Sequence, residues 1–267
     1  NRYRLLETVR EYCREKLQQS GEEIMIRTKH FEYFLALTYE ANQGLRGRDH
    51  IHWMKRLEQE HDNLRAAQEF ASTEGSSALA QSGLRLALNL EYFWFLRGYK
   101  EEYHVWLEKF LRHPQQPRHT PEYARLLSTI AHWEDDTARA IQFFEESRAL
   151  AETLDDESLI GEIHLSRASY GWREDVPYEA RQHFDQSLAC FRRSNDRWQM
   201  ARALAELGEF AQVRQDDRVV ARASFEESLR ISRELGDPRG IAFALVHLGD
   251  LAIEQNKLDD ARLYSTE

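Results

Sequence analysis

The fold is decided by residues 204–237, which read LAELGEFAQVRQDDRVVARASFEESLRISRELGD. The second half of this stretch places an alanine, a phenylalanine, a serine and an aspartate at positions that recur twice upstream, with alanines 40 and 41 residues apart. The three sets are Ala140, Phe144, Ser147, Asp156; Ala180, Phe184, Ser187, Asp196; and Ala221, Phe225, Ser228, Asp237. A repeat of this length predicts a solenoid of helical hairpins, because a single hairpin cannot bury its own apolar face.

The first half of the stretch also recurs, less completely. Its leucines and glycine have counterparts 41 residues later, in Leu204, Leu207, Gly208 and Leu245, Leu248, Gly249. A glycine inside a helix allows a second helix to approach closely, so we expect Gly208 to lie beside the small Ala221. Four units follow, at about 121–156, 157–196, 197–237 and 238–267, the last shortened. Pro121 and Pro238 each follow a capping residue and are predicted to begin helices.

The spacing of Leu-Gly, Ala and Phe resembles the tetratricopeptide repeat, although the period exceeds the roughly 34 residues usual for that family. Longer second helices, such as one over 221–235, account for the difference. The resemblance implies an all-α fold, a right-handed α-α superhelix of helical hairpins. It also implies that ligands lie against the first helix of each unit, on the concave face.

Helical periodicity continues through residues 22–120, where the repeat is degenerate. Five helices are predicted there, and the stretch 113–120 is the expected boundary with the regular array. The predicted helices are 24–39, 51–59, 62–71, 78–97 and 101–112, with breaks at 44–47, 72–77, 98 and 113–117.

A second resemblance covers most of the chain. The motifs are YRLLETVREY at 3–12, EHDNLRAA at 60–67 and YFWFLRG at 92–98. Their order is similar to that in bacterial STAND-type regulatory ATPases, in which a winged-helix module precedes a tetratricopeptide sensor. The resemblance implies that residues 1–21 are the tail of the winged helix, including its closing strand. The chain opens on Asn1 rather than methionine, so we expect a fragment of a larger protein.

That resemblance also implies a nucleotide switch upstream, which the array would contact within the same molecule. The chain has no Gly-x-x-x-x-Gly-Lys-Ser/Thr loop, so ATP or ADP and magnesium are expected only on the switch, and no cofactor is expected here.

Composition limits the partners. The formal net charge is −10, so the body should be repelled by nucleic acid and by anionic membrane surfaces. No segment approaches the 18 apolar residues of a membrane span. Two cysteines, Cys13 and Cys190, do not make a disulfide framework, which favours a cytoplasmic location.

Each pattern that could indicate catalysis or metal binding is better explained by an ordinary structural role. His50 and His52 are two residues apart and would point to different sides of a helix. His132–Asp136 reads as a turn in which Asp135 or Asp136 caps the next helix. The cysteines lack a neighbouring base. The aromatic run 92–95 could be a stacking platform, but most of its members should be core. We therefore expect no enzyme and no metal site.

The concave face remains as the candidate site, for a protein or a small-molecule inducer. The positions carried over from the tetratricopeptide family are Arg125, Thr129, His132, Trp133, Ser169, Trp172, Arg173, Arg202, Glu209, Gln212, Asp250 and Glu254. The leading hypothesis is a sensor arm of a STAND regulator that controls transcription. The alternative is a stand-alone tetratricopeptide adaptor that gathers partner proteins without a nucleotide switch.

Overall fold

The computed structural model describes residues 7–73, 75–173, 177–214 and 217–266. Fifteen α-helices and no strands occur in these ranges. The stretch 3–12, expected to hold the closing strand and helix of the winged helix, is described only from Glu7, where a helix begins, and residues 1–6 lie outside the described residues. No helix in the described ranges combines the length and the apolar character that a bilayer crossing requires.

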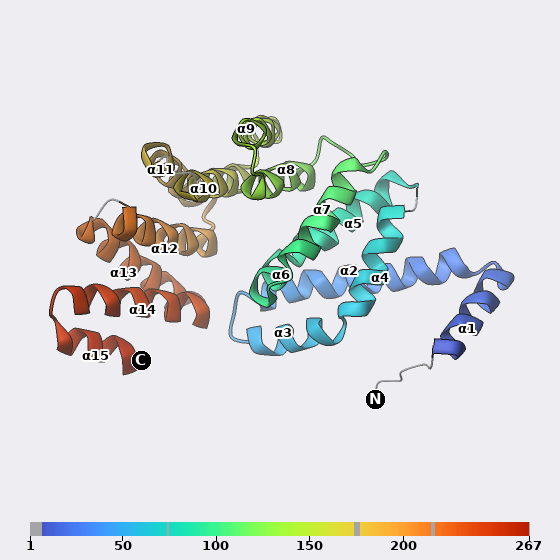
Figure 1. The fold of residues 1–267 in the computed structure, drawn as a ribbon, viewed down its shortest axis with the longest axis horizontal. Helices are drawn as coiled ribbons and strands as arrows, with labels where there is room; N and C mark the ends of the chain where they lie inside the picture. The colour runs from blue at the N-terminus through green and yellow to red at the C-terminus, as the bar shows by residue number, and fades with distance from the viewer. Residues whose placement is uncertain (1–6, 74, 174–176, 215–216, 267) are drawn as a thin grey trace.

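The first seven helices form the N-terminal unit and the next eight form the array (Figure 1). The N-terminal unit comprises α1 Glu7–Ser20, α2 Glu23–Gly44, α3 His50–Gln59, α4 His61–Thr73, α5 Ser77–Asn89, α6 Glu91–Arg97 and α7 Lys100–Arg112. The array comprises α8 Pro121–Trp133, α9 Thr137–Thr153, α10 Glu157–Arg173, α11 Pro177–Ser194, α12 Arg197–Arg214, α13 Arg218–Leu235, α14 Pro238–Glu254 and α15 Leu258–Thr266.

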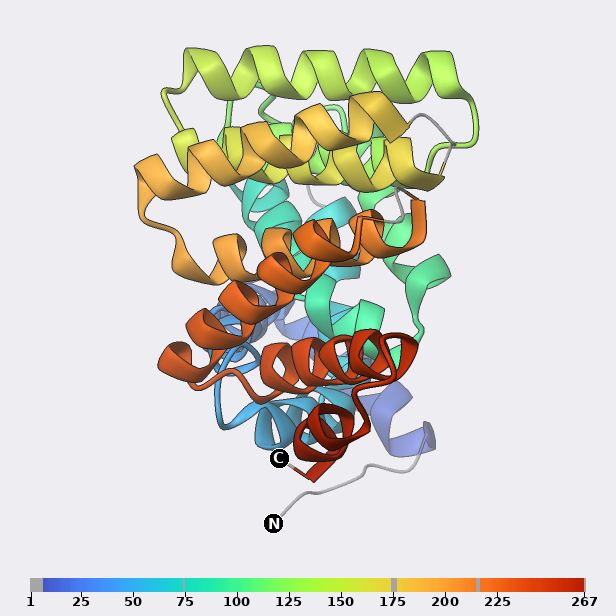
Figure 2. The same cartoon turned by 90° about the vertical axis from the view of Figure 1, so that its left-hand side faces the viewer.

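The array consists of the hairpins α8–α9, α10–α11, α12–α13 and α14–α15, each packed against the next. Helices α8, α10, α12 and α14 line the inner side of an arc that faces the N-terminal unit (Figure 1). Helices α9, α11 and α13 lie on the outer side, as Figure 2 shows. The core of the N-terminal unit continues into α8 through Tyr123, Leu126, Leu127 and Ile130.

Two of the upstream motifs pack against each other. His61, from the EHDNLRAA segment, lies against the aromatic run, with ring centroids 5.1 Å from Trp94 and 4.6 Å from Tyr99. Phe93 and Trp94 are both fully buried, which confirms that part of the run is core, whereas Phe95 is exposed.

The single helix predicted over 78–97 is wrong, because α5 ends at Asn89 and α6 begins at Glu91. Leu90, between the two helices, is fully buried, and so are Phe93 and Trp94 on α6.

The repeated residues have specific structural roles. The phenylalanines Phe144, Phe184 and Phe225 are at most 2% exposed. Two of the serines join the helices of a hairpin, since Ser147 Oγ donates to the Ala124 carbonyl at 2.6 Å and Ser228 Oγ to the Ala201 carbonyl at 2.8 Å.

The repeated aspartates cap the following helices through their side-chain oxygens. Asp156 accepts from the backbone N–H of Leu159, Asp196 from that of Gln199, and Asp237 from those of Arg239 and Gly240. The residue before each aspartate is left-handed, with φ of 53°, 56° and 68° at Asp155, Asn195 and Gly236. A left-handed residue ends one helix and the aspartate caps the next. The repeated aspartate therefore marks a turn, whereas the repeated alanine and phenylalanine mark the core. The caps expected at Thr120 and Asp237 are confirmed, and Asp136 caps α9.

Gly208 lies under a phenylalanine ring. A Cβ added at Gly208 would be 2.7 Å from Cε1 of Phe225, whose ring is fully buried. At Gly249, the matching position of the next unit, the nearest atom would be Tyr264 Cβ at 3.9 Å. Close packing against a ring therefore requires glycine at position 208, whereas position 249 has room for a side-chain methyl group.

We expect Gly208→Ala to lower the free energy of unfolding by about 1–3 kcal/mol, because the added methyl forces the Phe225 ring to move within a packed core. Gly249→Ala is the matched control and should be neutral or stabilising by up to about 1 kcal/mol, since alanine favours helix and meets no close atom. Urea unfolding followed by circular dichroism measures both. Equal losses in the two variants would contradict the packing argument.

Two imidazoles meet in the α10–α11 hairpin. Nδ1 of His164 is 3.0 Å from Nδ1 of His183, and the rings are stacked. Burial, with the charge of His183 added, lowers the pKa of His164 to about 4. One Nδ1 proton satisfies this contact, because one ring donates and the other accepts. A proton on the other Nδ1 as well would remove the acceptor and leave two N–H groups facing each other.

We expect the protein to lose roughly 2 kcal/mol of stability through His164 as the pH falls from 7.5 to 5. The folded pKa lies below the unfolded value of about 6.5, so the unfolded chain takes up the proton first. The stabilisation is therefore complete above that value and is lost on acidification toward the folded pKa. Urea midpoints at both pH values should fall less in His164→Gln than in the parent protein. A parallel fall in both would contradict this prediction.

Candidate functional site

Side-chain contacts at one spacing connect successive inner helices. Each joins residues that are 37 positions apart, from α5 to α8, from α8 to α10 and from α10 to α12. The contacts are Arg85 to Glu122 at 2.7 Å, Arg125 to Glu162 at 2.7 Å and Ser169 to Glu206 at 2.5 Å. We call these three contacts the ladder. Partly exposed ion pairs each contribute under about 1 kcal/mol, so the ladder orients the inner surface more than it stabilises the fold.

Arg125 makes the best-formed pair of the ladder. Its guanidinium donates from Nε and from Nη2 to the two carboxylate oxygens of Glu162, at 2.7 and 3.0 Å. The charge of Glu162 raises the pKa of Arg125. Burial acts to raise the pKa of Glu162, but the charge and hydrogen bonds of Arg125 keep it below its usual range. Both groups are therefore charged and held in a planar fork.

Six charged residues gather on the inner surface, and we call them the inner charged cluster. They are Arg46, Glu91, Arg125, Glu162, Arg202 and Glu206, from the α2–α3 loop and helices α6, α8, α10 and α12. The charges of Arg125, Arg202 and Glu162 act on both Arg46 and Glu91. Arg202 donates from Nε to Glu206 at 3.0 Å.

Part of the predicted concave set lies at this cluster. Besides Arg125 and Arg202, Ser169 belongs to the ladder, and Thr129 is buried. His132 Nδ1 lies 3.4 Å from the Ser166 carbonyl, and burial lowers the pKa of His132 to about 4. The ring is therefore neutral at pH 7 and donates its Nδ1 proton to that carbonyl.

Trp133 is the last residue of α8 and Arg173 the last residue of α10. Arg173 donates to the His132 carbonyl at 2.6 Å, and its guanidinium is 5.9 Å from the centroid of the Trp133 ring. Lys100 Nζ lies 3.5 Å from the same ring. These contacts attach the start of α7 to the end of α8.

The remaining predicted residues are placed elsewhere or pack inward. Trp172 packs against Phe210 in the core, with ring centroids 6.1 Å apart. Gln212 bonds Glu254 at 3.3 Å near the ends of α12 and α14. Glu209 is half-buried, and desolvation, with the nearby charge of Glu206, raises its pKa. Asp250 is exposed on α14.

A second contact brings the N-terminal unit to the far half of the array, and we call it the closing cluster. It consists of Arg46, Tyr92, Phe95, Trp198 and Arg239. The Arg46 guanidinium lies 4.2 Å over the Trp198 ring, and Tyr92 meets Trp198 edge-on at 6.0 Å. Arg239 lies 4.9 Å over Tyr92 and 5.6 Å over Phe95. The inner sides of α12 and α14 thus face α6 across the arc (Figure 1).

Only some members of the two clusters were predicted from the sequence. The spacing of 37 between arginine and glutamate, seen in Arg85–Glu122 and Arg125–Glu162, is a signal that could have found the ladder. Arg46, Glu91 and Trp198 have no comparable signal, because the residues that they lie near are roughly 35 to 155 positions away in the chain and on no common repeat position.

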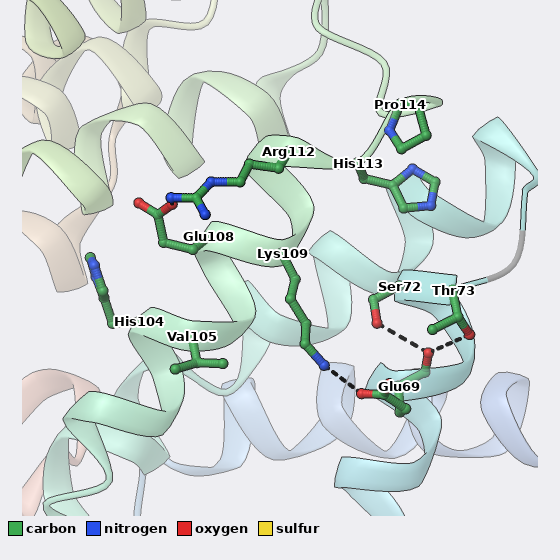
Figure 3. A pocket seen from close by; sticks show the side chains of 10 residues that line it. All are labelled: Glu69, Ser72, Thr73, His104, Val105, Glu108, Lys109, Arg112, His113 and Pro114. Carbon is green, nitrogen blue, oxygen red and sulfur yellow. Dashed lines mark hydrogen bonds and ion pairs between the residues drawn. The ribbon is translucent and has the colours of Figure 1, made fainter.

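A groove on the described surface lies away from these clusters (Figure 3). Its volume is about 590 Å³, between the end of α4 and helix α7. Lys109 crosses it to Glu69 at 2.5 Å, and Ser72 and Thr73 donate to the Glu69 carbonyl. These lining groups satisfy one another, and none of the predicted concave residues lines the groove.

Across the described residues, no group of three or more histidine, cysteine, aspartate or glutamate side chains is arranged to hold a metal ion. Cys190 is buried, and burial raises its pKa to about 11, which keeps the thiol protonated at neutral pH. A protonated thiol is a poor nucleophile.

The chain is similar to three mycobacterial proteins over a limited segment. It is 40% identical over 110 residues to proteins described as a "Putative HTH-type transcriptional regulator", one from Mycobacterium bovis and two from Mycobacterium tuberculosis. The segment covers 41% of this chain and 12% of each relative, so the chain spans only a small part of their length. No family model matches the chain.

A solved structure has a similar fold. The crystal structure of BtubC (BKLC) from P. vanneervenii superposes with a TM-score of 0.50 at 16% identity. The superposition covers 88% of this chain and 87% of that one, so the likeness extends over both the N-terminal unit and the array. At this identity the likeness concerns the fold alone.

Proposed function

We propose that this chain is a non-catalytic, ligand-sensing arm of a transcription regulator, in which the array moves relative to the N-terminal unit. The closing cluster is the observation that carries the proposal. Extensive helix packing between the two parts is limited, among described residues, to α5 and α7 against α8. The closing cluster is a smaller contact far from that junction, so it can open while the junction holds.

A ligand that binds the inner surface shifts this equilibrium if it prefers one of the two arrangements. The inner charged cluster is suited to that role because residues of both parts contribute to it. The relatives described as transcriptional regulators support a regulatory role. The tetratricopeptide assignment and the STAND-type architecture, with a winged helix and an ATP-binding switch upstream in a cytoplasmic protein, are part of the proposal.

The experiment has two steps. Reading the coding sequence upstream of Asn1 should reveal a Gly-x-x-x-x-Gly-Lys-Ser/Thr loop followed by a winged helix. Residues 121–267 are then deleted from that full-length protein, and nucleotide exchange and reporter transcription are measured. We expect both to change and to become independent of inducer. Unchanged exchange and unchanged transcription would refute the sensing role.

A groove on α14 favours the alternative, an adaptor that binds partner proteins. Arg239, Ala242, Phe243, Val246 and His247 line this groove of about 270 Å³, and Val246 is 61% exposed. The adaptor predicts a stable partner whose capture is lost in Val246→Glu, together with a start codon just before Asn1.

A further inference from the structure

Two opposite charges in the inner charged cluster have no polar partner. The guanidinium of Arg46 lies over the Trp198 ring, and none of its N–H groups makes a hydrogen bond within the described residues. Glu91 likewise makes no side-chain hydrogen bond or ion pair there. By contrast, Arg125 is paired with Glu162, and Arg202 with Glu206. An unpaired arginine and an unpaired carboxylate thus share one surface with satisfied pairs.

Both unpaired groups are partly shielded from water. Desolvation raises the pKa of Glu91, even though Arg202, Arg125 and Arg46 pull it down. Desolvation also lowers the pKa of Arg46. Each group is therefore held at a cost that a ligand of opposite charge would relieve.

Buried polar atoms at the same place also lack partners. Tyr103 is 5% exposed, and its hydroxyl, beside Thr129, makes no well-formed hydrogen bond within the described residues. The charges of Glu91 and Arg125 act on that hydroxyl, which places it beside the cluster. Gln199 is 4% exposed, its side chain lies against Glu162 of the cluster, and its Oε1 is unpaired among the described residues. Buried polar atoms are nearly always hydrogen-bonded, so these two indicate where a ligand would be met.

We propose that the inner charged cluster binds a small zwitterion, a free amino acid or a short peptide, with its ammonium group on Glu91 and its carboxylate on Arg46. An arginine stacked on an aromatic ring keeps its in-plane N–H groups free for a carboxylate. An ammonium group has three donors, which Glu91, the Tyr103 hydroxyl and Gln199 Oε1 can accept. The cluster contains three arginines and three glutamates, so a ligand of zero net charge preserves its balance.

The inference rests on the proposed sensing function for its biological meaning, but binding is tested separately. The full chain is titrated by calorimetry with each of the twenty free amino acids and with dialanine and trialanine. Each ligand that binds is repeated as its N-acetyl derivative and as its carboxamide. We expect binding by one or more zwitterions and at least about tenfold weaker binding of either blocked form, because each loses a charge-assisted contact. Tighter binding of dialanine or trialanine than of alanine would identify the ligand as a short peptide rather than a free amino acid.

The site is tested with two substitutions and one control. Glu91→Gln and Arg46→Gln should each weaken zwitterion binding by about tenfold or more. Glu234→Gln, on the outer helix α13, removes a carboxylate from ion pairs with Arg230 and with Arg197 at the start of α12, and should bind like the parent chain. Thermal melts establish that every variant is folded, and Arg46→Lys provides a second, milder change.

Absence of binding by every zwitterion overturns the inference, as does equal binding of the blocked forms or of both site variants. These outcomes differ from failure of the proposed function. If deletion of residues 121–267 alters transcription while no zwitterion binds, the ligand class is wrong and the sensing role stands. If zwitterions bind at Glu91 and Arg46 but the deletion changes nothing, the site stands and the regulatory role is wrong.

Discussion

Trp94→Ala is expected to lower the free energy of unfolding by about 3–5 kcal/mol, the largest stability effect of any substitution considered. Trp94 is fully buried and packs edge-on against His61 and Tyr99, at centroid distances of 5.1 and 5.8 Å. Its removal leaves a cavity where the EHDNLRAA and YFWFLRG segments meet, and both segments lose their main contact. Urea unfolding followed by tyrosine fluorescence and circular dichroism measures the loss.

Trp94→Phe is the matched control. The Trp94 Nε1 group is buried without a hydrogen-bond partner, so replacing the indole by a phenyl ring removes an unsatisfied donor as well as some volume. The two effects oppose each other, and we expect a loss below roughly 1.5 kcal/mol. A loss as large as that of Trp94→Ala would show that the indole N–H matters and would contradict its placement.

Trp198→Ala is expected to open the protein. It removes the Arg46 contact at 4.2 Å and the Tyr92 contact at 6.0 Å, which are the central contacts of the closing cluster. Together a cation–π contact and an aromatic pair are worth on the order of 2 kcal/mol, so the population of the open arrangement should rise about 30-fold. Small-angle X-ray scattering should show a larger radius of gyration, while the helix content stays unchanged.

Trp198→Phe keeps a ring at this position and should scatter like the parent chain. A double-mutant cycle with Arg46→Met isolates the pairwise contact, because the second substitution should have little effect once Trp198 is gone. An unchanged radius of gyration in Trp198→Ala would show that the two parts are held by the α8 junction alone.

Several features of the array could be predicted because they are local or repeat along the chain. An aspartate caps a helix by accepting from backbone N–H groups two or three residues further along the chain. Asp156, Asp196 and Asp237 therefore indicate three turns without any tertiary information. A phenylalanine that recurs at one position of every hairpin must fill the same seam. The helical character of the N-terminal unit followed from periodicity in the same way.

Other features could not be predicted because they depend on where distant segments meet. Leu90 is ordinary in sequence, and none of its neighbours along the chain indicates that α5 ends before it and α6 begins after it. Gly208 and Gly249 look alike in the sequence, yet only Gly208 is covered by a phenylalanine ring.

The sequence by itself determined the class of fold, the turns and the residues that fill the hairpins of the array, since these rest on contacts within one repeat or between neighbours. Only the tertiary structure decided which charges meet on the inner surface. Arg46 and Trp198 are about 150 residues apart and share no pattern, and they come together because the array curves back toward α6 (Figure 1). Curvature accumulates from small rotations between hairpins, and no single segment of sequence specifies their sum.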